Sequence, residues 1–307
     1  MKNVTIGLIQ SKDRGSKENN LKSAISQIRR AAKLGAKIIC LMELFDTAYF
    51  PQTENADKNK LAESIPGKVT KAFGRLAKEL RAVIIAPLCE KATGGKYYDT
   101  AIVFSETGKI LGKYRKNHIP HDPGFYEKKY FEEGDNGYKI FKTKFAKFAV
   151  LICYDQWFPE AARMARLAGA EIIFYPTGLG DIIGYKSEGD WHGAWETIQR
   201  GHAIANSLYV AVANRVGREG RMQFFGQSFV SDPFGKIIKK AGKTSEEVLV
   251  VDLDLERNKF FSEGWGFLRN RRPDTYKSLT TNKLVEKSRR LKNVPHYEDE
   301  KKALAGK

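Results

Sequence analysis

KFAVLICYDQWFPEAARMARLAGA, residues 147–170, is the stretch that decides the fold. Its apolar run, residues 148–152, predicts a short buried strand, and Pro159 followed by apolar residues at helical spacing predicts a helix. Cys153 therefore lies at a strand-to-helix corner, where backbone N–H groups without a partner in the strand can hold a developing oxyanion. That position suits a nucleophile. Cysteine is also among the residues most often buried, so Cys153 taken alone is compatible with a place in the core.

On both sides of this stretch, strand patterns alternate with helix patterns. The first helix pattern ends at Gly35, and the second has Pro66 in its first turn. Residues 97–116 read as a hairpin that turns at Gly108. The alternation predicts a layered α/β protein with sheets inside and helices outside. The predicted helices are residues 21–32, 65–80, a segment from 159, and 195–206; the other predicted strands are residues 4–10, 36–45, 81–90, 171–180, 208–217, 223–231 and 246–255.

Two charged residues end predicted strands. Glu43 follows a largely apolar run, where a carboxylate is costly to bury, so it is either salt-bridged or a proton acceptor with a raised pKa. Lys116 ends the hairpin, and a lysine in that position is ordinarily a solvated surface charge. Together with Cys153 they supply a base, a cation for an oxyanion and an attacking sulfur. This set suits hydrolysis at a carbonyl or nitrile carbon and needs no metal.

A long loop, residues 117–137, follows the hairpin. Loops of this length are usually functional or disordered, and its many aromatic residues argue against disorder. His118, His121 and Glu127 are its candidates for proton chemistry. Because the two histidines lack further residues at ligand spacing, no metal site is predicted.

Composition and charge narrow the class of protein. The chain has 307 residues, 42% of them hydrophobic, and no apolar run near the roughly 18 residues needed to span a bilayer, so we expect a globular protein without a membrane partner. The net charge of +17 raises nucleic acid as a partner, but the basic residues are scattered, so none is predicted. No glycine-rich phosphate-binding motif follows a strand, and no cofactor is predicted.

The two ends of the chain and its cysteines give further expectations. The first residues enter a strand pattern without a signal-peptide cleavage site, so we expect a cytoplasmic protein. The three cysteines, Cys40, Cys89 and Cys153, fit neither a disulfide framework nor a metal site, and free thiols are expected. Residues 1–277 are predicted to form one hydrolase domain. Residues 278–307 are highly charged and predict an extended arm, which could pack on a neighbouring subunit.

Four motifs resemble the nitrilase superfamily of carbon–nitrogen hydrolases, a resemblance that covers roughly residues 4–277. They are LMELFDTAYF around Glu43, YRKNHIP around Lys116, FYEKKYFEEGD around Glu127 and CYDQWFPEAARMARLAGAEIIFYPT from Cys153. The resemblance implies a four-layer αββα sandwich. It also implies that two copies pair across their helices into an αββααββα homodimer or a higher homo-oligomer.

The resemblance also implies roles for individual residues. Glu43 would take the thiol proton, and Lys116 with the backbone N–H of Tyr154 would hold the oxyanion. Glu127 would orient the substrate or Lys116. Cys153 would carry the acyl group until water, activated by Glu43, releases it. The remaining candidates for oxyanion or substrate binding are Gln156, Trp157, Thr177 and His121, with neither metal nor cofactor.

Within the superfamily, the chain is most similar to the branch that hydrolyses N-carbamoylputrescine to putrescine, ammonia and carbon dioxide through a cysteine carbamoyl thioester, a step in polyamine biosynthesis. The similarity lies in DQWFPEAAR, QRGHAIAN, VANRVG and WGFLRNRRPDTYK. Relatives that cleave carbamoyl amino acids place an arginine where this chain has Gln156 and Trp157, so a substrate carboxylate would lack its partner. The candidate partners of a cationic amine tail are Asp181, Glu188, Asp190 and Glu196.

Other functions remain open on the sequence. The substrate could be another carbamoyl amide, as for a β-ureidopropionase or an N-carbamoyl amino acid amidohydrolase, or the protein could be a general amidase or nitrilase. A basic binding protein on an inactive scaffold is the alternative from a different class, and the presence of Glu43, Lys116 and Cys153 argues against it.

Overall fold

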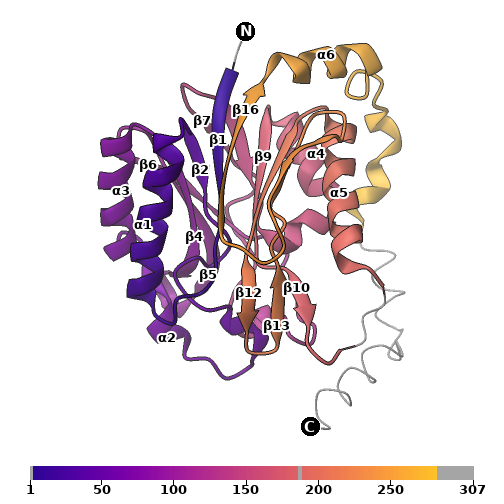
Figure 1. Cartoon of the computed structure of the whole chain (residues 1–307). Helices are drawn as coiled ribbons and strands as arrows, with labels where there is room; N and C mark the ends of the chain where they lie inside the picture. The colour runs from indigo at the N-terminus through magenta and orange to yellow at the C-terminus, as the bar shows by residue number, and fades with distance from the viewer. Residues whose placement is uncertain (1–2, 186–188, 282–307) are drawn as a thin grey trace.

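Two β-sheets pack face to face, and helices cover the outer side of each (Figure 1). The computed structural model describes residues 3–185 and 189–281. The first sheet has the spatial order β16 (Glu247–Asp254), β1 (Asn3–Gln10), β2 (Ile38–Cys40), β4 (Val83–Lys91), β5 (Tyr97–Phe104) and β6 (Ile110–Arg115), with β3 (Glu63–Ser64) beside β4. The second has the order β15 (Ile237–Lys240), β14 (Phe229–Ser231), β11 (Tyr209–Asn214), β9 (Ile172–Thr177), β8 (Lys147–Val150) and β7 (Ile140–Lys142).

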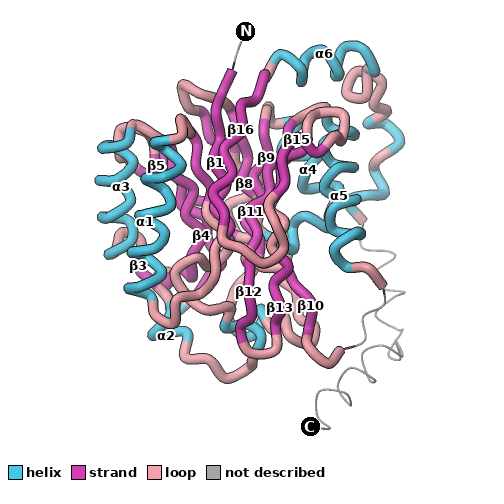
Figure 2. Tube along the Cα trace, viewed as in Figure 1, coloured by secondary structure: helices cyan, strands magenta, loops and turns pink. Residues whose placement is uncertain are grey.

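The helices complete four layers. Helices α1 (Lys17–Lys33) and α3 (Lys68–Leu80) lie on the first sheet, and α4 (Pro159–Leu167) and α5 (Trp191–Asn206) lie on the side of the second (Figure 2). This is the predicted αββα sandwich. A small third sheet has the order β10 (Gly180–Ile182), β13 (Met222–Phe225) and β12 (Val216–Glu219). The remaining helices are α2 (Lys58–Leu61), α6 (Glu256–Trp265) and the 3-10 helices Phe50–Gln52, Thr93–Gly95, Glu127–Lys129, Cys153–Trp157, Pro273–Thr275 and Lys277–Thr280.

Most apolar residues of the two large sheets lie in two clusters of core, and a third cluster includes residues of the small sheet. In β2, Ile38 and Cys40 join the cluster between the sheets, whereas Ile39 joins the cluster beneath α1 and α3. Successive side chains of a strand point to opposite faces, so a strand covered on both sides must be apolar throughout. This requirement explains the unbroken apolar runs in the sequence.

The parallel strands within each sheet have their carboxyl ends at one edge of that sheet. β1, β2 and β4 run parallel in the first sheet, as do β8, β9 and β11 in the second. β6 has the same direction as β4, because each is antiparallel to β5. Loops at the carboxyl ends of parallel strands share one edge of a sheet, the edge at which α/β proteins place their sites.

Several element boundaries differ from the sequence prediction. α1 begins at Lys17 rather than at residue 21, and the strand predicted at residues 208–217 is β11 and β12, which belong to different sheets. α3 begins at Lys68 rather than at residue 65, because Gly67 precedes it and bonds to the Thr70 hydroxyl. α5 begins at Trp191 rather than at residue 195, because the Asp190 side chain caps it by accepting from the Gly193 N–H at 2.8 Å. The single strand predicted at residues 223–231 is two strands in different sheets, since positive φ angles at residues 226 and 227 turn the chain between them.

Further predictions concerned the hairpin, the cysteines, membrane spans and the C-terminal arm. The hairpin of β5 and β6 is confirmed, and the three cysteines are free thiols, as predicted. In the part of the chain that the structure describes, no helix combines the length and the apolar character needed to cross a membrane. Of the predicted arm, residues 282–307 lie outside the described residues, so the arm stays a prediction.

Candidate active site

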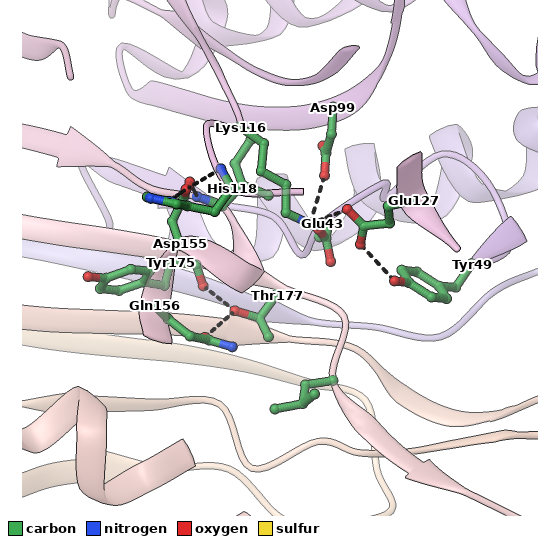
Figure 3. Close-up of polar contacts among 12 residues, drawn as sticks. Glu43, Tyr49, Asp99, Lys116, His118, Glu127, Asp155, Gln156, Tyr175 and Thr177 are labelled. Atoms are coloured by element: carbon green, nitrogen blue, oxygen red, sulfur yellow. Dashed lines mark hydrogen bonds and ion pairs between the residues drawn. The ribbon is translucent and has the colours of Figure 1, made fainter. Parts of the chain in front are cut away.

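A buried ammonium group lies at the centre of the site (Figure 3). Lys116 follows β6, and its Nζ lies 2.8 Å from Glu43 Oε1, beyond the end of β2. Glu127 Oε2, from the long loop, lies 2.6 Å from the same nitrogen. Asp99 Oδ2, from the middle of β5, lies 3.6 Å away. The structure therefore brings together Glu43, Lys116 and Glu127, as predicted from the sequence, and adds Asp99.

The charges in this cluster shift one another's pKa values. Burial opposes the charged form of Lys116, but the Glu127 and Glu43 carboxylates raise the pKa of its ammonium well above its usual range. Burial raises the pKa of Glu127 to about 7, although Lys116 and the Tyr49 hydroxyl, 2.8 Å away, act in the opposite direction. Lys116 is therefore a permanent cation inside the protein, of the kind that stabilises negative charge in a transition state.

Cys153 is presented on a strained turn. It follows β8, begins a 3-10 helix and has a φ of 41°, in the left-handed region that residues other than glycine rarely adopt. Only 5% of its surface is exposed. Burial and the Glu43 carboxylate raise the pKa of the thiol well above its usual range, while Lys116 and the Gly178 N–H act in the opposite direction. The sulfur is therefore protonated at rest, and its attack on a substrate requires a base.

Asp155 ties this turn to the first sheet. Its Oδ2 accepts hydrogen bonds from the Ile152 N–H at 2.9 Å and from the Tyr114 hydroxyl, in β6, at 2.7 Å. Its Oδ1 accepts from the His118 N–H at 3.1 Å and lies 2.6 Å from His118 Nδ1. His118 thus orients Asp155 and the turn after β8. Sequence reasoning missed Asp155, for which the only signal was its place two residues after Cys153.

Glu43 has one carboxylate oxygen available on the side of the sulfur. Oε1 is bonded to Lys116, whereas Oε2 has no hydrogen-bond partner among the residues that the structure describes. A Cβ atom built on Gly178 would lie 2.9 Å from Oε2, and the N–H of the same glycine interacts with the Cys153 sulfur. Gly178 therefore lies beside both groups. This arrangement allows Glu43 to accept the thiol proton.

Arg215 fixes the backbone that carries Glu43. It follows β11 in the second sheet and is fully buried. Its Nη2 donates to the carbonyl oxygens of Glu43 at 3.1 Å, Leu44 at 2.8 Å and Thr47 at 3.0 Å. Its Nη1 donates to Glu219 at 2.6 Å, which neutralises the guanidinium charge. One side chain of the second sheet thus holds a loop of the first, a contact that no local pattern in the sequence indicated.

A cavity of about 430 Å³ opens onto Cys153 and Glu127. Tyr154 and Trp157, both predicted site residues, line it. Asp122 and Glu127 supply its carboxyl groups, and no lysine, arginine or histidine is among the described residues of its lining. The described lining is therefore mostly apolar and aromatic, and its charged members are acids. The other aromatic residues of the lining are Phe125, Tyr185 and Trp191.

Three predicted substrate-binding residues lie away from this cavity. Gln156 is fully buried, and its Oε1 accepts hydrogen bonds from Thr177 at 3.3 Å and from two α5 side chains, Trp195 at 2.9 Å and Gln199 at 2.7 Å. Neither Gln156 nor Thr177 is part of the cavity lining, because both are engaged in this network. His121 lines a second, more polar cavity of about 470 Å³ next to it, which shares Asp122 and Tyr154.

The acids proposed for the amine tail also lie elsewhere. Asp190 caps α5, and Glu196 forms ion pairs with Lys240 at 2.6 Å and Arg200 at 3.8 Å. Asp181 is exposed and is not part of the cavity lining, and Glu188 lies outside the described residues. The acids in the cavity lining are Glu127, which is paired with Lys116, and Asp122, which the sequence reasoning did not single out.

Comparison with known proteins places this site in a family. Residues 5–260 match the carbon-nitrogen hydrolase family. The chain belongs to that family. This match confirms the superfamily expected from the four motifs, and it makes the protein a hydrolase that acts on carbon–nitrogen bonds of amides.

Relatives within the carbon-nitrogen hydrolase family extend over nearly the whole chain. N-carbamoylputrescine amidase of Oryza sativa subsp. japonica is 42% identical over 287 residues, which are 91% of this chain and 95% of the relative. A citrullinase of Francisella tularensis is 36% identical, over 91% of this chain and 99% of the relative. The crystal structure of a carbon-nitrogen hydrolase from Helicobacter pylori G27 has a TM-score of 0.87 and 40% identity, and it covers 91% of this chain and 99% of that one.

The closeness of Gly178 to Glu43 predicts the effect of a single methyl group. We expect Gly178→Ala to displace the Glu43 carboxylate and to lower kcat on a linear amide by roughly tenfold to hundredfold, because a misplaced base transfers protons poorly. Circular dichroism and thermal melting should match the wild type. The control is Gly201→Ala in α5, where an added Cβ meets no atom within 4 Å. An unchanged kcat in Gly178→Ala would contradict the placement of the base.

The pKa of Glu127 predicts a loss of activity in acid. Protonation of Glu127 removes a partner of Lys116, and the ammonium then binds Glu43 more tightly and makes it a weaker base. The ionised form is the active one, so kcat/KM should be about half its maximum near pH 7 and should fall further as the pH drops. A pH–rate profile at constant ionic strength measures this. Glu127→Gln cannot be ionised and resembles the protonated form, so it should have a low kcat/KM without this limb. A limb that stays in place would assign it to another group.

Proposed function

We propose that the protein hydrolyses N-carbamoylputrescine to putrescine, ammonia and carbon dioxide. The observation that carries this proposal is the cavity at Cys153, which has aromatic walls and carboxyl groups and no basic residue in its described lining. The name of the rice relative supports the same substrate. A carbamoylated diamine has a ureido group at one end, which would meet Cys153. Its apolar stem would contact the aromatic walls, and the ammonium at its other end would meet a carboxyl group.

The first half of the reaction acylates the enzyme. Cys153 attacks the ureido carbon while its proton passes to Glu43 Oε2, and the carbonyl oxygen becomes an oxyanion next to the Lys116 ammonium and the backbone N–H of Tyr154. The bond from this carbon to the putrescine nitrogen then breaks. Glu43 returns the proton to the leaving amine, and Cys153 retains a carbamoyl thioester.

The second half releases the carbamoyl group. Water gives a proton to Glu43 and attacks the thioester carbon, through the same oxyanion position. The carbon–sulfur bond breaks, and the thiolate recovers the proton from Glu43. The product, carbamic acid, decomposes to ammonia and carbon dioxide. Glu127 acts throughout by holding Lys116, with which it forms a contact of 2.6 Å.

The ammonium end of the substrate would bind near Asp122. This carboxylate lies in the cavity lining near Tyr154, whose phenol it affects electrostatically. The rings of Trp157 and Trp191 add faces that attract a cation. A substrate with a carboxylate at this end would face the like charge of Asp122. This difference favours a carbamoylated amine over a carbamoylated amino acid.

The expected homodimer stays a prediction. Its place would be the outer face of α4 and α5, where Met164, Leu167 and Ile204 are exposed apolar side chains. Such a patch is typical of surfaces that another subunit covers.

Ammonia release from a panel of ureido compounds tests the proposed function. The wild-type protein should hydrolyse N-carbamoylputrescine with a higher kcat/KM than citrulline or N-carbamoyl-β-alanine, which have the same ureido group and add a carboxylate. Cys153→Ala should release no ammonia, and mass spectrometry of quenched wild-type enzyme should show a carbamoyl adduct on Cys153. Faster turnover of either carboxylate-bearing compound would overturn the proposed substrate and leave the mechanism in place.

The role of Asp122 is tested separately with Asp122→Asn. Because the carboxylate is solvent-exposed, we expect KM for N-carbamoylputrescine to rise only about twofold to fivefold, with kcat retained. N-butylurea, which lacks the ammonium, should be hydrolysed equally by both proteins. Asp181→Asn, which removes an exposed acid outside the cavity lining, is the matched control. Equal losses on both substrates would show that Asp122 does not recognise the cation.

A further inference from the structure

Asp99 is a buried acid in the site to which the proposed reaction gives no task. Its side chain is fully buried in β5, and neither carboxyl oxygen has a hydrogen-bond partner among the described residues. Carboxyl oxygens of Asp99, Glu43 and Glu127 all lie within 4.8 Å of one another. The main chain is fixed as well, since the Asp99 carbonyl accepts the Lys116 N–H at 2.9 Å.

The charges of this cluster do not balance if every acid is ionised. Three carboxylates would face one ammonium, because the nearby Arg215 is already paired with Glu219 at 2.6 Å. An uncompensated buried charge costs several kcal/mol, and like charges at this separation raise each other's pKa. The cluster must therefore hold at least one proton in addition to those of the Lys116 ammonium.

The hydrogen bonds indicate which acid holds this proton. Glu43 accepts a bond from Lys116 at 2.8 Å, and Glu127 accepts from Lys116 at 2.6 Å and from the Tyr49 hydroxyl at 2.8 Å. These donors favour the ionised forms of both glutamates. Asp99 receives no such bond and lies farther from the ammonium, at 3.6 Å. Burial and the Glu43 carboxylate raise the pKa of Asp99 well above its usual range.

We propose that Asp99 is a positioning residue that stays protonated and donates a hydrogen bond from its carboxyl group to the Glu43 carboxylate. This bond would hold Glu43 with Oε2 directed to Cys153, and it would remove one negative charge from the cluster. The proposal rests on the proposed role of Glu43 as the base. Its first test needs no turnover, so it can fail separately from the proposed function. The titratable groups that face Asp99 and its partners are Glu43, Lys116, Glu127, Tyr49, Cys89 and Cys153.

Infrared spectroscopy detects the proton directly. Protonated carboxyl groups absorb at higher frequency than carboxylates, and near neutral pH the ordinary surface acids are ionised. We expect a carboxylic acid band in the wild-type protein that shifts when aspartate is labelled with carbon-13 and that is absent from Asp99→Asn. Asp46, a second buried aspartate with a raised pKa, makes Asp46→Asn the control, which should keep the band. If Asp99→Asn loses no such band, the proposal is overturned.

Two substitutions test the positioning role. Asp99→Val removes the donor to Glu43, and we expect kcat to fall roughly tenfold to hundredfold with little change in KM. Asp99→Asn supplies a neutral amide donor in the same place, so it should restore most of the lost rate. If Asp99 instead acts as an anion, Asp99→Asn would be as damaging as Asp99→Val, and this result would overturn the proposal. Should Asp99→Val fail to fold, the infrared band and the rate of Asp99→Asn still decide.

Discussion

The arrangement of the whole site depends on one buried ammonium group. Lys116 has no exposed surface, so its charge has to be balanced inside the protein. The carboxylates that do so, Glu43 and Glu127, come from the loop after β2 and from the long loop after β6. Glu127 is in turn fixed by Tyr49. The charge of one lysine thus orders two loops that lie far apart in the sequence.

The second constraint is the junction between the two sheets. Lys116 and Glu43 belong to the first sheet, whereas Cys153 follows a strand of the second. Asp155 and Arg215 cross this junction with hydrogen bonds to Tyr114 and to the backbone at Glu43. Gly178 lies where the two groups meet and leaves room for them by having no side chain. A strained cysteine turn can persist because contacts on both sides determine its conformation.

The sequence indicates the layered fold and the strand-end residues because both depend on short-range patterns. Apolar runs that stop at Glu43, Lys116 and Cys153 mark strand ends, and strand ends gather at one edge. These patterns do not indicate Asp99, because it lies inside a strand. A polar residue there fits the usual alternation of polar and apolar residues along a strand. The direction of Gln156 depends on packing against α5, which no local pattern specifies. Helix starts were misplaced for a related reason, since the side chains of Thr70 and Asp190 decide them.

The reactive residues and the residues that line the cavity come from different parts of the fold. The reactive groups stand at or beside the ends of strands, while much of the cavity wall, including Asp122, Phe125 and Tyr185, comes from loops. Loops accept substitutions more readily than packed strands do. Mutations over evolutionary time can therefore exchange one substrate for another while the machinery for breaking the bond is inherited intact.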